Sequence, residues 1–335
     1  MSIYDKYQPV IGLEVHAQLL TTSKAFCADA TTYGAPPNTQ ISVISLGHPG
    51  TLPKLNEKVV EYAVKLGIAT NSEIQAENHF SRKNYFYADL PKGYQISQFD
   101  TPICAKGFIT IKMPDGEKRI GLTRIHIEED AGKSIHDIDP FFTLIDLNRA
   151  GVPLLEIVSE PDLRSPEEAY EFLTEVRKLV RYLEVCDGNM EEGSMRCDAN
   201  VSVMLKGAEE FGKKVEVKNM NSIRNVKRAL EHEIKRQIDA IEAGEVIDQD
   251  TRTFDAVTGI THSMRSKEMA HDYRYFTEPD LPPLYITQEY IDSVRSQMDP
   301  LPNELFEKYT AKLGLSEYDA GVLTDEKEVA LYFED

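Results

Sequence analysis

The sequence lacks the features of membrane and secreted proteins. No apolar run approaches the ~18 residues that a membrane-spanning helix needs, and the N-terminus shows neither a signal peptide's apolar core nor a transit peptide's Arg/Ser bias. The 335 residues include only four cysteines, which are widely spaced and form no CxxC pair. This usage indicates a reduced, cytoplasmic protein with unpaired thiols and no membrane partner.

Basic residues are also scarce. The chain has 37 Lys and Arg against 56 Asp and Glu, a formal net charge of -19. This balance argues against binding DNA through a broadly basic surface. It leaves room for a nucleic acid that is held by a local basic patch or by other subunits.

Familiar catalytic and nucleotide-binding motifs are missing as well. The sequence contains no GxGxxG, no HExxH and no GxSxG. Residues 188–194 have the glycine spacing of a phosphate-binding loop, but the Gly-Lys pair that such a loop requires is absent and Met195 follows. If the protein binds ATP, it does so without any of these common nucleotide-binding motifs.

The pattern that is present combines many short strands with three amphipathic helices. We predict helices from about Glu57 to Leu66, with Asn56 as N-cap and Gly67 as stop, from Pro166 to about Leu183 after a Ser165 capping box, and from Ile223 to Ala243. Strand candidates are residues 11–19, 109–113, 120–127, 142–147, 154–158 and 200–205. Strands outnumber helices without regular βαβ alternation, so we expect an α+β fold with a large mixed, mostly antiparallel sheet.

The pattern changes after about residue 290. Short helical segments are expected at 291–297, 303–313 and 325–333. We therefore predict a main domain over residues 1–290 and the beginning of a small helical domain over 291–335.

Several acidic residues stand out within apolar strands. In IGLEVHAQL, Glu14 and His16 share one strand face while Leu13 and Val15 point the other way. A solvated surface pair is the alternative reading. A second group, Glu128-Glu129-Asp130, is either a surface acidic turn or a site where a cation offsets the mutual repulsion. Carboxylates with one imidazole suit Mg²⁺ or Mn²⁺ better than zinc.

Two segments carry basic residues that could hold phosphate. Residues 81–98 combine Arg82, Lys83 and Lys92 with aromatic side chains around a Leu90–Gly93 turn, for which a plain hairpin is the alternative. From Lys213 to Arg236 there are eight Lys or Arg and three Glu. This is either a nucleic-acid surface or a solvated helix face.

Together, several motifs resemble the GatB/GatE family, the B subunits of tRNA-dependent amidotransferases. They occur in family order and cover nearly all of residues 8–285: IGLEVHAQL, SRKNYFYADLPKGYQISQ, RIHIEEDAGK, DLNRAGVPLLEIVSEPD, GNMEEGSMRCDANVSV, EVKNMNSIRNVKRALEHEIKRQ and THSMRSKEMAHDYRYFTEPDLPPL. The resemblance implies a cradle fold similar to glutamine synthetase. It also implies ATP-dependent phosphorylation of the side-chain carboxylate of Glu-tRNA(Gln) or Asp-tRNA(Asn), followed by displacement of phosphate by ammonia.

The resemblance also implies roles for individual residues. The residues that match the family's metal-binding positions are Glu14, His16, Glu128, Glu129, Asp198 and Glu216. Glu129 would face away from Glu128 in a regular strand, so its role needs a bulge or a strand end. Lys83 and Lys92 match polar positions near the entry of ammonia, and they join Glu14, His16 and Glu128 as expected catalytic residues. Phosphate contacts are expected from Arg82, Asn148 and Arg149.

The implied partners are an amidase A subunit that releases ammonia from glutamine, a small C subunit and the misacylated tRNA. Many relatives hold zinc with four cysteines. Here only Cys27 remains, while Asp29, Ser42 and Ser45 stand at the other positions, so no zinc is expected. The family continues into a longer helical domain and a tRNA-binding tail domain, and we expect this sequence to stop before most of them. A non-catalytic tRNA-binding scaffold and a stand-alone metallohydrolase are the alternative functions.

Overall fold

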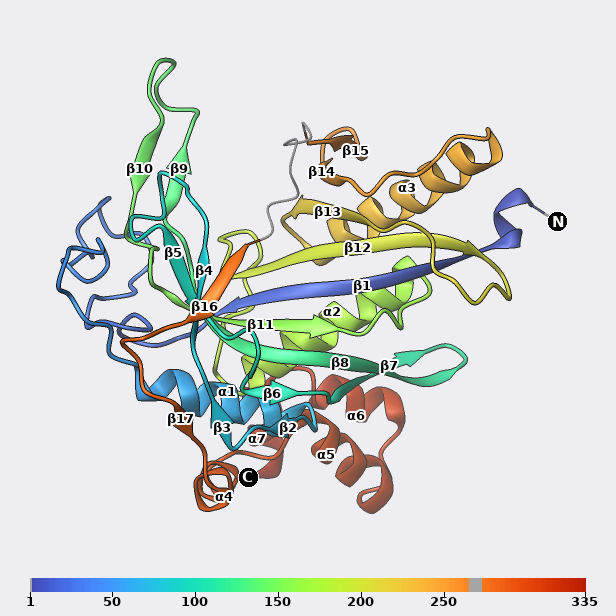
Figure 1. Ribbon diagram of the computed structural model, residues 1–335. Coiled ribbons are helices and arrows are strands. Elements are labelled where there is room, and N and C mark those ends of the chain that lie inside the picture. The colour runs from blue at the N-terminus through green and yellow to red at the C-terminus, as the bar shows by residue number, and fades with distance from the viewer. Residues whose placement is uncertain (1, 265–272) are drawn as a thin grey trace.

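The computed structural model describes residues 2–264 and 273–335, which form an α+β fold around one large mixed sheet (Figure 1). The strand order is β15-β14-β13-β12-β1-β11-β8-β6-β2, with β7 paired to β8. The bounds are β1 Tyr7–Gln18, β2 Glu73–Ile74, β6 Cys104–Ala105, β7 Phe108–Met113, β8 Gly116–Glu129, β11 Pro153–Ser159, β12 Met195–Leu205, β13 Val215–Met220, β14 Thr251–Asp255 and β15 Ile260–Ser263. Among these described strands only the β13–β14 pairing is parallel.

The predicted α+β fold with a large mixed sheet is therefore confirmed. All six strand candidates overlap observed strands. Three observed strands begin at least four residues earlier than predicted, β1 at Tyr7, β8 at Gly116 and β12 at Met195. Part of the last family motif, residues 265–272, lies outside the described residues.

Smaller sheets surround the large one. They comprise β16 (Arg274–Thr277), β4 (Ser81–Asn84) and β5 (Tyr94–Ser97) in one sheet, β9 (Lys133–Ile135) with β10 (Leu144–Asp146), and β3 (Glu77–Asn78) with β17 (Leu284–Tyr285). The predicted turn between β4 and β5 is confirmed, because the Gly93 amide donates to the Leu90 carbonyl at 3.0 Å.

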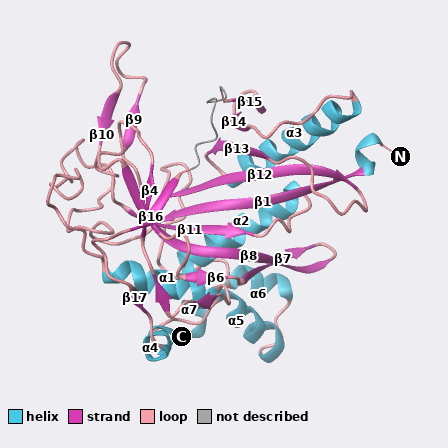
Figure 2. Cartoon of the chain, in the orientation of Figure 1, coloured by secondary structure: helices cyan, strands magenta, loops and turns pink. Residues whose placement is uncertain are grey.

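Three long helices, α1 (Glu57–Ala69), α2 (Pro166–Tyr182) and α3 (Ile223–Glu242), lie along one face of the large sheet (Figure 2). Each begins with a side-chain cap that satisfies a free backbone amide. The capping residues are Asn56, Ser165 and Ser222. The predicted helix positions are thus confirmed.

The predicted stop of α1 at Gly67 is wrong, because the helix continues to Ala69. A Cβ at Gly67 would lie only 2.6 Å from Cys104 Sγ. The glycine therefore serves the close packing of α1 on β6 rather than the end of the helix.

A group of short elements follows the main fold: α4 (Gln288–Ser296), α5 (Pro302–Glu307), η2 (Lys308–Lys312), α6 (Glu317–Leu323) and α7 (Lys327–Glu334), while η1 (Ile3–Lys6) precedes β1. Val294 of α4 belongs to the main core, whereas Leu305 and Tyr309 pack in a separate small cluster. The helix α6 was not predicted. The domain boundary near residue 290 stays a prediction. No helix among the described residues is long and apolar enough to cross a bilayer.

Candidate metal centre

A row of polar side chains crosses four adjacent strands on the sheet face that the three helices leave uncovered. His126 of β8 lies opposite Glu156 of β11, Glu156 lies opposite His16 of β1, and His16 lies opposite Arg196 of β12. Directly paired residues of antiparallel strands project to the same face. The register of the sheet therefore gathers two imidazoles, a carboxylate and a guanidinium, and we call these four residues the cross-strand row.

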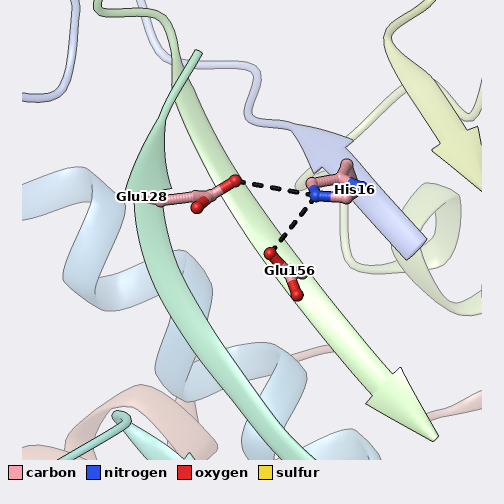
Figure 3. Close-up of side chains that lie close together, drawn as sticks. All are labelled: His16, Glu128 and Glu156. Carbon is pink, nitrogen blue, oxygen red and sulfur yellow. Dashed lines mark ion pairs between the residues drawn. The ribbon is translucent and has the colours of Figure 1, made fainter. Parts of the chain in front are cut away.

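Glu128, two residues beyond His126 on the same face of β8, completes a compact group with His16 and Glu156 (Figure 3). His16 Nε2 lies 3.2 Å from a Glu156 oxygen and 3.6 Å from a Glu128 oxygen. One donor atom from each of the three side chains lies within 4.8 Å of the others. His126 Nε2 lies 3.4 Å from Glu156. The three side chains point toward a common centre.

The charges in this group stabilise one another. Burial opposes ionisation of both carboxyls, but His126, His16 and Lys83 outweigh it and hold the pKa of Glu156 far below its ordinary value. The pKa of Glu128 is also lowered, mainly by His126 against the effect of burial. Conversely, burial disfavours the His16 cation, yet Glu156 and Glu128 raise its pKa. The site thus holds two buried, ionised carboxylates.

The donor set fits a hard divalent cation. Two carboxylates and one imidazole form an oxygen-rich set of the kind that Mg²⁺ and Mn²⁺ accept. Among the residues that the structure describes, His16, Glu128 and Glu156 form the group of possible metal ligands whose donor atoms all lie within 4.8 Å of one another. The buried Nδ1 of His126 has no hydrogen-bond partner in the described chain. The donor chemistry therefore supports a metal site at this position, and we call His16, Glu128 and Glu156 the candidate metal centre, or metal centre for short.

Three of the predicted ligands form a separate group beside the row. Asp198 and Glu216 both pair with Lys218, with the Lys218 Nζ to Glu216 distance at 2.9 Å, and Asn200 donates to Glu14 at 2.8 Å. Burial raises the pKa of Glu14, and the nearby carboxylates raise it further. We call Glu14, Asp198 and Glu216 the Lys218 cluster. The ammonium of Lys218 already provides a positive counter-charge for this cluster.

Glu129 lies apart from both groups, and its predicted role as a metal ligand stays a prediction. The pairing of β8 with β11 is regular from Arg124 to Glu129, so no bulge turns this side chain toward Glu128. Its carboxylate instead accepts hydrogen bonds from Lys92 Nζ and from the Ile96 amide, the latter at 2.9 Å. Lys92 is therefore an ion-pair partner of Glu129, away from the metal centre.

Lys83 is the predicted basic residue that faces the metal centre. Although burial opposes its charge, Glu128 and Glu156 raise its pKa. Its ammonium also lies 4.7 Å from the centre of the Tyr273 ring. A partly buried cation thus stands near the two carboxylates.

The predicted phosphate contacts have partners within the chain. Arg82 pairs with Glu278 at 2.7 and 2.9 Å. Arg149 donates to the carbonyls of Ala131 and Gly132. The third residue, Asn148, accepts from the Gln40 amide and donates to Pro36. The structure gives each of the three an intramolecular role, and phosphate contact stays a prediction.

Sequence reasoning missed Glu156, His126 and Arg196. The sequence did contain a signal for Glu156, because it is the single charged residue at the centre of PLLEIVS, a strand that is otherwise apolar. Burying a lone carboxylate in such a strand is costly unless it is paired.

The four residues at the positions where many relatives hold zinc, Cys27, Asp29, Ser42 and Ser45, lie close together in the structure. Asp29 accepts hydrogen bonds from the Ser45 hydroxyl and from the Ser42 amide, and Cys27 Sγ lies 3.4 Å from Ser45 Oγ. The ammonium of the fully buried Lys24 donates to the Gln40 carbonyl at 2.7 Å and lies 3.4 Å from Ser45 Oγ. One thiol beside a buried ammonium is a poor zinc donor set. The absence of zinc stays a prediction.

Buried, ionised carboxylates beside imidazoles and a lysine are typical of the catalytic domain of an enzyme that acts on charged groups. Residues 9–292 match the family described as the GatB/GatE catalytic domain, and the chain belongs to that family. The B subunit of aspartyl/glutamyl-tRNA(Asn/Gln) amidotransferase from Thermodesulfovibrio yellowstonii is 55% identical over 98% of this chain and 69% of its own length. Its counterparts from Myxococcus xanthus and Geotalea uraniireducens are 56% and 57% identical, each over 98% of this chain and 68% and 69% of their own lengths.

Proposed function

We propose that the chain is the activating subunit of a tRNA-dependent amidotransferase that supplies Gln-tRNA(Gln) or Asn-tRNA(Asn) for protein synthesis in the cytoplasm. The names of the relatives support the subunit role. The proposed partners are an amidase A subunit, a small C subunit and the misacylated tRNA. The fold likeness to glutamine synthetase, which activates a carboxylate in the same way, is part of this proposal.

The proposed reaction has two steps. The side-chain carboxylate of the misacylated tRNA attacks the γ-phosphorus of ATP, releasing ADP and leaving an acyl phosphate. Ammonia then attacks the acyl carbon, the carbon–oxygen bond to phosphate breaks, and loss of a proton leaves the amide. A carboxylate is a poor electrophile, so the first step provides the leaving group that the second step needs.

The group of His16, Glu128 and Glu156 is the observation that carries this proposal. These residues would hold Mg²⁺ or Mn²⁺, which would offset the negative charge of the phosphates as they approach the substrate carboxylate. Lys83 adds a fixed positive charge beside the same carboxylates. Because Glu128 and Glu156 are almost fully buried, their charges act where water screens them little.

The test is reconstitution of the chain with A and C subunits, ATP, glutamine and Glu-tRNA(Gln). Glu128→Ala and Glu14→Ala should abolish formation of Gln-tRNA(Gln) while glutamine hydrolysis by the complex stays measurable. Loss of both activities would indicate failed assembly, which gel filtration detects. Full amidation by the Glu128→Ala complex would refute the proposal.

The scaffold alternative depends on the basic face of α3. The face comprises Arg224, Lys227, Arg228, Lys235 and Arg236, and two of these cations have acidic partners: Lys227 pairs with Glu167 at 3.0 Å, and Arg236 pairs with Glu233. If this face still binds tRNA, charge reversal at Lys227 and Arg228 weakens binding of all tRNAs and flattens its salt dependence. A stand-alone metallohydrolase would hydrolyse its substrate without a misacylated tRNA, so stimulation of ATP hydrolysis by Glu-tRNA(Gln) separates it from the proposed ligase.

A further inference from the structure

The β9–β10 hairpin projects from the body of the molecule and carries an apolar tip (Figure 1). Ile138, Phe141 and Phe142, which we call the hairpin tip, are 68%, 87% and 70% exposed. None of them belongs to an apolar cluster within the described chain. Large apolar side chains gathered in this way on a surface mark an interaction site.

The base of this hairpin is firmly attached to the fold. Ser134 donates to Asp89 at 3.1 Å, and the Gly132 amide donates to the Asp89 carbonyl at 2.8 Å. On the other strand, Asn38 donates to the Ile145 carbonyl at 2.9 Å and accepts from the Leu147 amide at 2.8 Å. The base of the hairpin is therefore fixed to the segments that carry Asp89 and Asn38.

The backbone of the turn that carries the two phenylalanines is also held by hydrogen bonds. One oxygen of Asp139 accepts hydrogen bonds from the backbone amides of Phe141 and Phe142, at 2.8 and 3.0 Å. Across the hairpin, His136 Nδ1 lies 3.1 Å from Thr143 Oγ1. A surface that is ordered before association loses less entropy on binding. The two phenylalanines are thus presented in an arrangement suited to docking.

Charge and location restrict the partner. Asp137 and Asp139 flank the apolar residues, and the whole chain carries a net charge of -19, so a second copy of this chain would be repelled. A partner with a cationic rim would be attracted. The hairpin follows directly on the end of β8, which carries Glu128. The base of the hairpin is thus connected directly to the strand that carries Glu128.

We propose that the hairpin tip inserts into an apolar groove with a Lys- or Arg-rich rim on another subunit of the amidotransferase complex. This inference rests on the proposed function, because the relatives are named as one lettered subunit of such an enzyme. The phenylalanines supply the apolar contact, and Asp137 and Asp139 face the basic rim.

The test measures association of the full chain with the purified remaining subunits. The double variant Phe141→Ser/Phe142→Ser should bind at least about tenfold more weakly, since buried aromatic anchors contribute more than about 1 kcal/mol each. Asp139→Ala keeps both phenylalanines but removes the two turn hydrogen bonds, and should weaken binding severalfold. The matched control is Phe211→Ser/Val257→Ser, which removes two apolar side chains exposed elsewhere, at 56% and 93%.

Three outcomes decide the matter. Unchanged affinity of the Phe141/Phe142 variant, or an equal loss in the control, would overturn the inference. Self-association of the wild-type chain that this variant abolishes would also overturn it, by identifying a second copy as the occupant. Binding of Mn²⁺ by the chain tests the proposed function separately. The hairpin variant should bind Mn²⁺ as the wild type does. If the wild type does not bind Mn²⁺, the proposed function fails, but the result for subunit association still holds.

Discussion

Replacing Glu156 by glutamine removes one negative charge from the metal centre and preserves the shape of the side chain. Two unit charges about 4 Å apart interact by about 4 kcal/mol at an effective dielectric constant of about 20. Glu156 lies within that distance of His16 and His126, at 3.2 and 3.4 Å, and a cation at the common centre would be similarly close. Allowing for partial compensation by water and by the amide oxygen, we expect a loss of about 3 kcal/mol, or about a hundredfold in affinity.

Calorimetric titration of the purified chain with Mn²⁺ and Mg²⁺ measures this effect directly. The control is Glu160→Gln, which removes a carboxylate from the residue after β11, where Glu160 accepts from Thr123 at 2.9 Å outside the row. Circular dichroism melting of each variant establishes that the fold persists. Glu160→Gln should bind metal as the wild type does.

Two results would refute the reasoning. If folded Glu156→Gln binds Mn²⁺ with wild-type affinity, this carboxylate is not a ligand. If Glu14→Gln abolishes binding while Glu156→Gln retains it, the cation lies in the Lys218 cluster instead.

Four further outcomes are expected. Chelation of divalent ions should lower the melting temperature of the wild type but not of Glu128→Ala, since a ligand of the folded state stabilises it, and scanning fluorimetry measures this. Glu233→Ala should lower the free energy of unfolding by about 1–3 kcal/mol, because Arg236 and Arg252 lose a fully buried counter-charge while Arg252 keeps its pairing with Asp250. Burial opposes ionisation of Glu233, but Arg236 holds its pKa below the ordinary value, so its contribution is complete above that value and is lost as the pH falls through the folded-state pKa. Denaturant unfolding across acid pH should therefore show a shallower loss for Glu233→Gln than for wild type. Gly132→Ala should cost about 1–3 kcal/mol in the same assay, because its Cβ would lie 2.8 Å from the Asp89 carbonyl oxygen.

Local patterns in the sequence predicted much of the fold. The alternation in IGLEVHAQL places Glu14 and His16 on one face, and the structure confirms it, with Leu13 and Val15 buried on the other. Helix caps were equally predictable, since Asn56 and its counterparts act within three residues of their partners. Such features depend on neighbours in sequence, which a single chain reveals.

The composition of the metal centre could not be predicted in the same way. Glu156 meets His16 only because β11 pairs with β1, and that pairing joins segments far apart along the chain. A resemblance to a family names positions, but it does not state which of them share a strand face. The six predicted ligands therefore divide among the metal centre, the Lys218 cluster and the Lys92–Glu129 pair.

Tertiary contacts also overrode the expected pattern within α3. Helical spacing from the buried Val226 and Leu230 would also bury Ile234 and Ile241, yet these two are only partly buried, whereas Glu233 and Gln237 are fully buried. The edge strand β15 supplies Thr261 to Glu233, and its neighbour β14 supplies Arg252, so a charged residue occupies the interior of the interface. Helical periodicity carries no information about a strand that packs on the helix from elsewhere.

The cross-strand row has a consequence for how the protein matures. Each strand in it contributes side chains that alternate between the two faces, so a slip of one residue in β1, β11 or β8 would turn a ligand toward the helices. The chain could then remain compact and still lack a metal centre. Under the proposed metal assignment, metal affinity would be a sensitive report of correct strand register, because it would distinguish chains that have reached the native pairing from those that have only collapsed.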